Sequence, residues 1–271
     1  MRQRALLPAF ALLVAFSPVL VELAGHMRDE AWPRYALVFA PLVAIVLARE
    51  SPSAPRRDGL LLLVVALGVE LFCLASNTTR LARPAFPLAL FGLCRAFGLA
   101  RGRTAMLAIW LVPVPWMWLK LTSPGLEQAW LQLAAGLVTG LGAELEVEHT
   151  LVRGVAGALS VHAGDSGIRL AVLLSGLGWY AGLRCGDAIA GCARRALLWA
   201  ALGLPAQALG TLLAVAVLAT GHAAAAGALL DPGLWIAVAG LGVARSEQLA
   251  RQPAQRPGDS EPAATGTHAS A

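Results

Sequence analysis

The sequence predicts an all-α fold, a polytopic transmembrane helical bundle of about eight spans with a short strand-like loop. Two observations carry this prediction: 58% of the 271 residues are hydrophobic and only 14% are charged, and apolar runs occupy nearly the whole chain. Soluble domains average about 25% charged residues, so this chain has too little polar surface to solvate a globule of its size. The runs also lack the strict alternation of a membrane β-barrel.

Each predicted span rests on an apolar run, because a bilayer crossing takes about 20 residues. The first run follows Arg2 and Arg4 and continues without a convincing cleavage site, so we interpret it as a retained anchor. A ninth stretch, 129–141, contains glycines and follows Glu127 and Gln128, which favours an interfacial or re-entrant segment. The eight predicted spans are 5–24, 35–48, 59–75, 85–100, 105–119, 168–183, 196–220 and 233–244.

The distribution of basic residues predicts the orientation of the bundle. With the N-terminus inside, 13 of the 21 Lys and Arg residues fall in inner loops, seven in outer loops, and Arg95 inside a span. Because basic residues concentrate in cytoplasmic loops, we expect both termini to be cytoplasmic. The transmembrane domain then covers 1–245, with a long outer loop at about 120–167. Residues 246–271 are rich in Pro, Ser and Gly, which predicts a disordered cytoplasmic tail.

Within the outer loop, residues 144–161 begin with alternating acidic and apolar side chains, which predicts a short strand. His149 and His162 flank this segment, but their spacing from the glutamates matches no metal-ligand pattern. The four cysteines form no CxxC pair. We therefore predict no metal site and no cofactor.

The net charge of +5 does not indicate a nucleic-acid partner, because no basic stripe interleaved with aromatic residues accompanies it. The expected partner is the lipid bilayer. Inside the predicted spans, Glu70 is a candidate functional carboxylate, since hydrocarbon penalises charge. The alternative is that Arg95 of the next span neutralises it. Glu22, Glu70 and Arg95 together also allow a third hypothesis, a small-solute transporter or channel-like protein with a polar path.

Several short motifs follow one another in a specific order. Val112–Trp116 contains two prolines that end or kink a helix near the outer face. An acidic turn at 140–148 leads into the predicted strand, and Asp-Ser-Gly-Ile-Arg at 165–169 opens the sixth span. The remaining motifs are Ser17–Leu23, Leu121–Pro124, the Arg194–Arg195 pair and the intrahelical Pro205.

Over about residues 15–244, this order and spacing resemble the exosortase/archaeosortase family, polytopic proteins of the bacterial and archaeal envelope. The resemblance implies a protein of the prokaryotic inner (cytoplasmic) membrane, related to cysteine transpeptidases. Such enzymes recognise a C-terminal sorting signal on exported proteins, a motif followed by a transmembrane helix and basic residues. A thiolate attacks the peptide carbonyl near the outer face, and an arginine and a histidine assist.

The chain departs from the family pattern at each catalytic position. Asp165 stands where the family has its cysteine, with Ser166 and Arg169 completing a vestigial motif. Counted from Pro205, the family's Asn and Arg positions fall on Thr211 and Ala214. The family's histidine position falls near Leu229, and His222 is seven residues away.

The other thiols do not replace the missing nucleophile in the predicted topology. Cys185 and Cys192 fall on the cytoplasmic side, while Cys73 and Cys94 lie inside other spans. We therefore expect a family member that lacks transpeptidase activity and binds sorting-signal helices or assists an active paralogue. The alternative is an active enzyme with altered catalytic groups around Asp165, among them Ser166 or His162.

Overall fold

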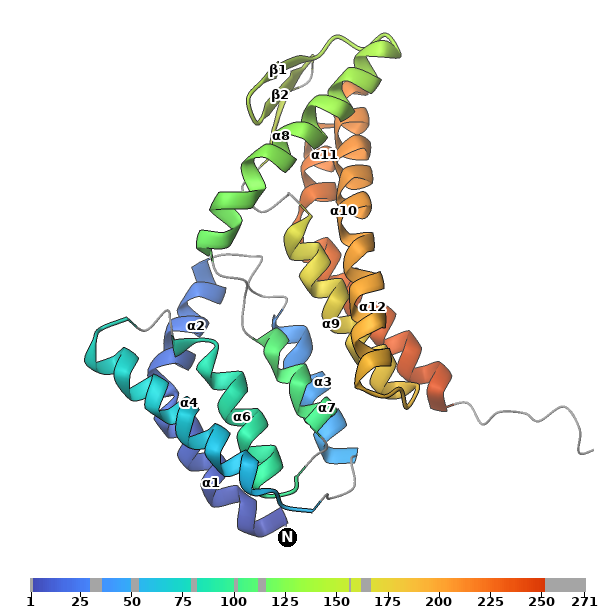
Figure 1. Cartoon of the computed structure of the whole chain (residues 1–271). Coiled ribbons are helices and arrows are strands. Elements are labelled where there is room, and N and C mark those ends of the chain that lie inside the picture. The colour runs from blue at the N-terminus through green and yellow to red at the C-terminus, as the bar shows by residue number, and fades with distance from the viewer. Residues whose placement is uncertain are drawn as a thin grey trace, which may run out of the picture.

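The computed structural model describes residues 2–29, 36–49, 54–78, 82–99, 102–111, 116–155, 157–161 and 167–251. These residues form helices and one small antiparallel sheet (Figure 1). By length and composition, α4 (Arg57–Ala75) and α10 (Ile189–Ala219) are suited to cross a membrane. A third candidate is α11 (Ala223–Leu230) taken together with α12 (Pro232–Arg251), which bend by 54° where they meet. The described residues thus support two or three spans, and the full set of eight stays a prediction.

Some predicted spans are divided into shorter helices. The first run contains α1 (Arg2–Ala15) and α2 (Ser17–Asp29), which meet where Pro18 lacks an amide donor and the Ser17 hydroxyl donates to the Val14 carbonyl at 2.8 Å. The predicted span at 105–119 is not one helix. It contains α7 (Gly102–Ala105) only at its start, then a 3₁₀ helix, η2 (Met106–Leu111), and a new helix begins at Trp116.

The three largest apolar clusters of the described residues hold the helices together, and the first joins α1, α2, α4 and α6 (Ala85–Ala96). Helices α4 and α6 approach closely because of glycine: a Cβ on Gly92 would lie 2.7 Å from the main-chain N of Leu63. Small residues permit such close approach of membrane helices. This N-terminal cluster comprises Leu12, Phe16, Val19, Ala66, Cys73, Ala82, Ala85, Phe86, Ala89 and Leu93.

The second cluster joins α3 (Ala36–Arg49), η2, α9 (Ile168–Arg184), the first half of α10, and α12. Helices α9 and α10 form an antiparallel hairpin (Figure 1), in which a Cβ on Gly178 would lie 2.7 Å from the Arg195 carbonyl oxygen. At the hairpin turn, Arg195 Nε donates to the Asp187 carboxylate at 2.6 Å. This central cluster comprises Phe39, Leu42, Val43, Leu107, Leu170, Leu173, Leu177, Trp179, Tyr180, Cys192, Ala196 and Ala239.

The third cluster joins the second half of α10, α11, α8 (Trp116–Gly140) and the sheet, which lie together at the end of the molecule opposite the α9–α10 turn (Figure 1). The sheet has the order β1 (Glu146–Glu148), β2 (Leu151–Gly154), β3 (Gly157–Ser160). Val152 of β2 pairs with Leu159 of β3, and both side chains are buried. The strand predicted within 144–161 is thus confirmed, as three short strands. This cap cluster comprises Leu131, Ala134, Ala135, Val138, Val152, Leu159, Val161, Ala214, Val215, Leu218, Ala226 and Leu230.

Two predicted loops and the predicted tail contain helix. The outer loop of 120–167 begins inside α8, one 25-residue helix that includes all but the last residue of the 129–141 stretch. The loop expected before the last span contains α11. The tail prediction is wrong for 246–251, because α12 continues to Arg251 through a segment of good helix formers. Residues 252–271 lie outside the described residues.

Candidate functional site

The motif at 165–169 ends at a glycine that anchors α9 against the middle of α10. Gly167 is the N-cap of α9, with φ of 87°, a left-handed conformation that glycine adopts without steric cost. A Cβ there would lie 3.0 Å from the Gln207 Cβ and 3.2 Å from the Gly203 carbonyl oxygen. Asp165, Ser166 and His162 themselves lie outside the described residues.

The other predicted positions lie on the same two helices, and all are buried. Arg169 is in the first turn of α9 and is 8% exposed. Thr211 and Ala214 are fully buried on α10. The Thr211 hydroxyl donates to the Gln207 main-chain carbonyl at 3.0 Å, so its one O–H donor is used within the helix. The structure therefore brings the start of α9 to the α10 turn that precedes Thr211.

Sequence reasoning missed two polar groups at this junction. Gln207 is 1% exposed, and neither its Oε1 nor its Nε2 has a hydrogen-bond partner among the described residues. The indole Nε1 of Trp235 is also shielded from solvent without a partner. Trp235 lies against Gly210, one turn after Gln207 on α10, because a Cβ on Gly210 would lie 3.1 Å from Trp235 Cζ2. A glutamine inside a long apolar helix is the signal that identifies Gln207; Trp235 offers none.

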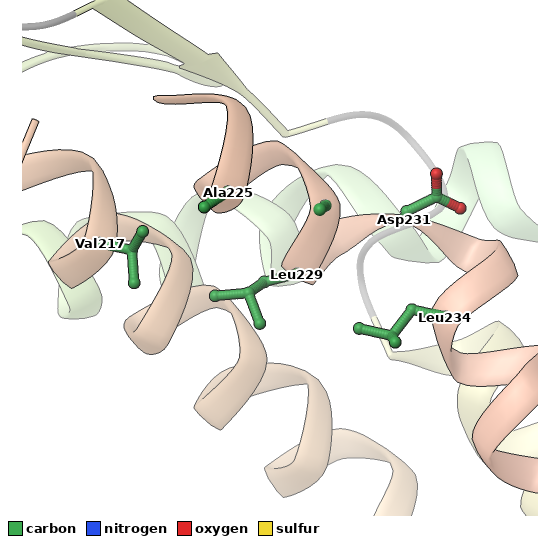
Figure 2. Close-up of a pocket in the computed structure, with 6 residues that line it drawn as sticks. Val217, Ala225, Leu229, Asp231 and Leu234 are labelled. Carbon is green, nitrogen blue, oxygen red and sulfur yellow. The ribbon is translucent and has the colours of Figure 1, made fainter. Parts of the chain in front are cut away.

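An apolar cavity of about 610 Å³ lies further along α10, at the bend between α11 and α12 (Figure 2). Leu234 reaches from α12 toward Leu229 of α11, and Val217 of α10 lies beyond Leu229 (Figure 2). Val217 is seven residues after Gly210, so both lie on one side of α10. Leu234, which lines the cavity, directly precedes Trp235 in α12. The cavity is lined by Val217, Ala225, Ala228, Leu229, Asp231 and Leu234.

The four cysteines lie away from this junction. Cys185 follows the last residue of α9, about 27 Å along that helix from Gly167. Cys192 is near the start of α10, about 28 Å along the helix from Thr211. Cys73 and Cys94 are buried among the N-terminal helices. In the described part of the chain, no group of three His, Cys, Asp or Glu side chains is placed to hold a metal ion.

The polar groups of the N-terminal helices pair differently from the prediction. Arg95 forms its ion pair with Asp58 at the start of α4, so the expected neutralisation of Glu70 by Arg95 is wrong. Glu70 is 1% exposed, and neither carboxylate oxygen has a hydrogen-bond partner. Glu22 accepts a hydrogen bond from Arg83 at 2.9 Å. Arg95 and Glu22 are thus held by separate partners.

Comparison with family models, curated proteins and solved structures gives no match for this chain. The chemistry of the site must therefore be inferred from its own groups. These are an amide, an indole N–H and the start of a helix beside an apolar cavity, with no thiol within reach. Hydrogen-bonding groups of this kind bind a ligand; they do not form a covalent bond to it.

Proposed function

We infer that this chain is a divergent protein of the exosortase/archaeosortase type, which binds the C-terminal sorting-signal helix of exported proteins without cleaving it. The membrane setting has the support of two or three apolar helices long enough to cross a bilayer. The assignment to this family and the peptide ligand are proposals, drawn from the order of motifs and from the geometry of the α9–α10 junction.

The observation that carries the proposal is the contact of Gly167 with Gln207. The family's nucleophile motif maps to 165–169, and two further catalytic positions, counted from Pro205, map to Thr211 and Ala214. Although about 40 residues separate these segments, Gly167 packs one turn before Thr211. The mapping requires such proximity, and the antiparallel α9–α10 hairpin provides it.

The chemistry of the mapped positions supports binding without catalysis. Transpeptidation of the family type requires a thiolate nucleophile with charged or proton-donating groups beside it. Here the cysteine's position is an aspartate, Ala214 has no functional group, and the Thr211 hydroxyl is bonded within its own helix. A carboxylate nucleophile at Asp165 would form an anhydride-like acyl intermediate, which is unstable. Lost catalysis therefore explains the three changes together better than altered catalysis does.

For the membrane arrangement, we propose that both termini are cytoplasmic in a prokaryotic inner membrane, and that α8, the sheet and α11 form an outer cap. Arg184, Arg194 and Arg195 then lie at the inner end of the α9–α10 hairpin, as expected for basic residues. The cavity beside Val217 lies toward the outer side, where an exported protein would present its signal. An active paralogue is a second proposed partner.

Transport of a small solute has weaker support. A polar path through Glu22, Glu70 and Arg95 requires these groups to line one passage. Instead, Arg95 pairs with Asp58, and Glu22 pairs with Arg83. Glu70 is buried on the face of α4 that carries Ala66 and Cys73 of the N-terminal cluster. A flux assay with Glu70→Gln in reconstituted vesicles tests this alternative: flux that depends on Glu70 would favour transport over peptide binding.

Binding of a synthetic sorting signal tests the proposal. The full-length protein in lipid nanodiscs is titrated with a labelled peptide that has a short polar segment, a 20-residue Leu/Ala helix and three C-terminal arginines. We expect saturable binding that competes with the unlabelled peptide. A control peptide carries the three arginines before the helix instead of after it, which reverses the favoured insertion. Absence of saturable binding, or equal binding of both peptides, would contradict the proposal.

A further inference from the structure

Gln207 presents an unusual combination of unpaired hydrogen-bonding groups. Its side chain is 1% exposed, and both the donor Nε2 and the acceptor Oε1 are shielded without a partner. Leaving a buried donor or acceptor unpaired costs about 1–3 kcal/mol. In an apolar helix, a residue with two such groups indicates a site that is completed by something outside the chain.

Trp235 adds a third group of the same kind. Its indole Nε1 is shielded and unpaired, and its ring covers Gly210, one turn from Gln207 on the same helix. A Cβ on Gly210 would lie only 3.1 Å from Trp235 Cζ2, so the absence of a side chain there allows the indole to lie against α10. The two side chains therefore offer three N–H donors, two of them on Nε2, and one C=O acceptor near one turn of α10.

The start of α9 lies at the same place. Gly167 caps the helix without a side-chain hydrogen bond, and its Cα carbon lies against the first carbon of the Gln207 side chain. Gln207 therefore lies where α9 begins. Gln207 indicates a ligand at this place, because its amide is buried and unpaired beside the start of α9.

The donor and acceptor set distinguishes between classes of ligand. A phospholipid ester supplies only acceptors and leaves the Gln207 Oε1 unpaired. An ionised carboxylate also supplies only acceptors and leaves the Gln207 Oε1 unpaired. A peptide group supplies one N–H donor and one C=O acceptor with two lone pairs, which matches Oε1, Nε2 and the Trp235 N–H. The apolar cavity beside Leu234 suits the hydrophobic side chains on either side of such a peptide group.

We propose that Gln207 and Trp235 form a recognition site for one main-chain peptide group of the bound signal, at the junction of α9, α10 and α12. The inference rests on the proposed function and names the residues that hold its ligand. The peptide would reach this site past the first turn of α12, which starts at the 54° bend beside the cavity. Trp235 is half-buried there. Gln207 and Trp235 are positioning residues, and the site involves no covalent step.

The test uses the same full-length protein and labelled peptide. Gln207→Leu and Trp235→Phe keep the approximate shape of each side chain and remove its hydrogen-bonding groups. Each lost hydrogen bond is expected to raise the Kd about three- to tenfold. The matched controls are Gln132→Leu on the exposed face of α8 and Trp199→Phe on the first half of α10, both expected to change the Kd less than twofold.

A second measurement separates recognition from structural damage. The peptide is synthesised as a series in which one peptide N–H at a time is replaced by an ester oxygen. One position of the series should bind wild-type protein about three- to tenfold more weakly, yet bind Gln207→Leu no more weakly than the all-amide peptide does. In addition, Gln207→Leu should raise the Tm, because it removes two unpaired buried groups.

The outcomes distinguish the two proposals. If wild-type protein does not bind the peptide, the proposed function and the proposed recognition site are both wrong. If wild-type protein binds but Gln207→Leu binds equally well, the peptide is held elsewhere and only this inference is overturned. A Tm lowered by Gln207→Leu together with an ester series that shows no special position would also overturn it, because Gln207 would then act in packing alone.

Discussion

Gly203 of α10 packs directly on Ala171 of α9: a Cβ on Gly203 would lie 2.8 Å from the Ala171 Cβ and closer still to the main chain. This contact fixes where along α10 the start of α9 packs, and hence places Gly167 beside Gln207. The candidate site thus depends on a glycine that takes no part in its chemistry.

Gly203→Ala should therefore destabilise the protein. Overpacking of this kind costs about 1–3 kcal/mol, and it should lower the Tm of the purified protein in nanodiscs. Gly240→Ala in α12 is the matched control, because a Cβ there meets nothing within 4 Å. That control should be neutral or stabilising, since alanine favours helix over glycine. Equal Tm values for the two variants would show that α9 and α10 do not pack as described.

Glu70 gives a prediction of the opposite sign. Its carboxylate lies in an apolar cluster with both oxygens unpaired, so Glu70→Leu should raise the free energy of unfolding by about 1–3 kcal/mol. Asp58→Asn, on the same helix, removes the ionised partner of Arg95 and should not stabilise the protein. A lower Tm for Glu70→Leu would contradict this account and point to a partner for Glu70 that the fold does not provide.

The exposed cysteine provides a test of membrane orientation. Cys185 is exposed, whereas Cys73, Cys94 and Cys192 are buried. A maleimide that cannot cross the membrane should leave Cys185 unmodified in intact cells and modify it after permeabilisation, as read by the mass of the purified protein. In a Cys185→Ser background, Leu141→Cys at the exposed end of α8 should react in intact cells. The reverse pattern would invert the proposed topology.

Asp165 tests whether catalysis has been lost. In cells that carry signal-bearing proteins, Asp165→Ala should leave their processing unchanged, because the aspartate is not a nucleophile in this proposal. Asp165→Cys should also fail to create processing, since Ala214 still lacks the guanidinium of the family pattern. Immunoblots of the signal-bearing proteins read both outcomes. Processing that disappears in Asp165→Ala would favour an active enzyme with altered groups.

The sequence predicts the helices best where apolar runs are long and uninterrupted. The runs behind α4 and α9 match the helices to within a few residues, since burial and helix propensity favour the same structure there. Prediction fails at the division of 105–119 and at α11, because short helices depend on tertiary contacts with α10 that no local pattern records. The C-terminal end of α12 was not predicted, because the tail was judged by its overall composition and the helix-forming residues at its start were not considered separately.

The candidate site divides in the same way. Thr211 and Ala214 were reached from motif spacing, and the structure places both on the α10 face beside the start of α9. Gln207 was within reach of sequence reasoning, as a lone amide in an apolar helix. Trp235 was not, because its relation to Gly210 depends on how α12 folds back along α10. A contact between two residues 25 positions apart, on different helices, cannot be predicted from the local sequence pattern.

The most direct test of the central claim, that the protein binds a sorting signal and does not cut it, is the mass of the bound peptide. The labelled signal peptide is incubated with wild-type protein in nanodiscs, recovered with the protein after washing, and measured by mass spectrometry. We predict saturable recovery of the peptide at its full mass, with no fragment and no covalent adduct on the protein. A cleaved peptide or an acyl adduct would contradict the claim, and so would failure to recover any peptide.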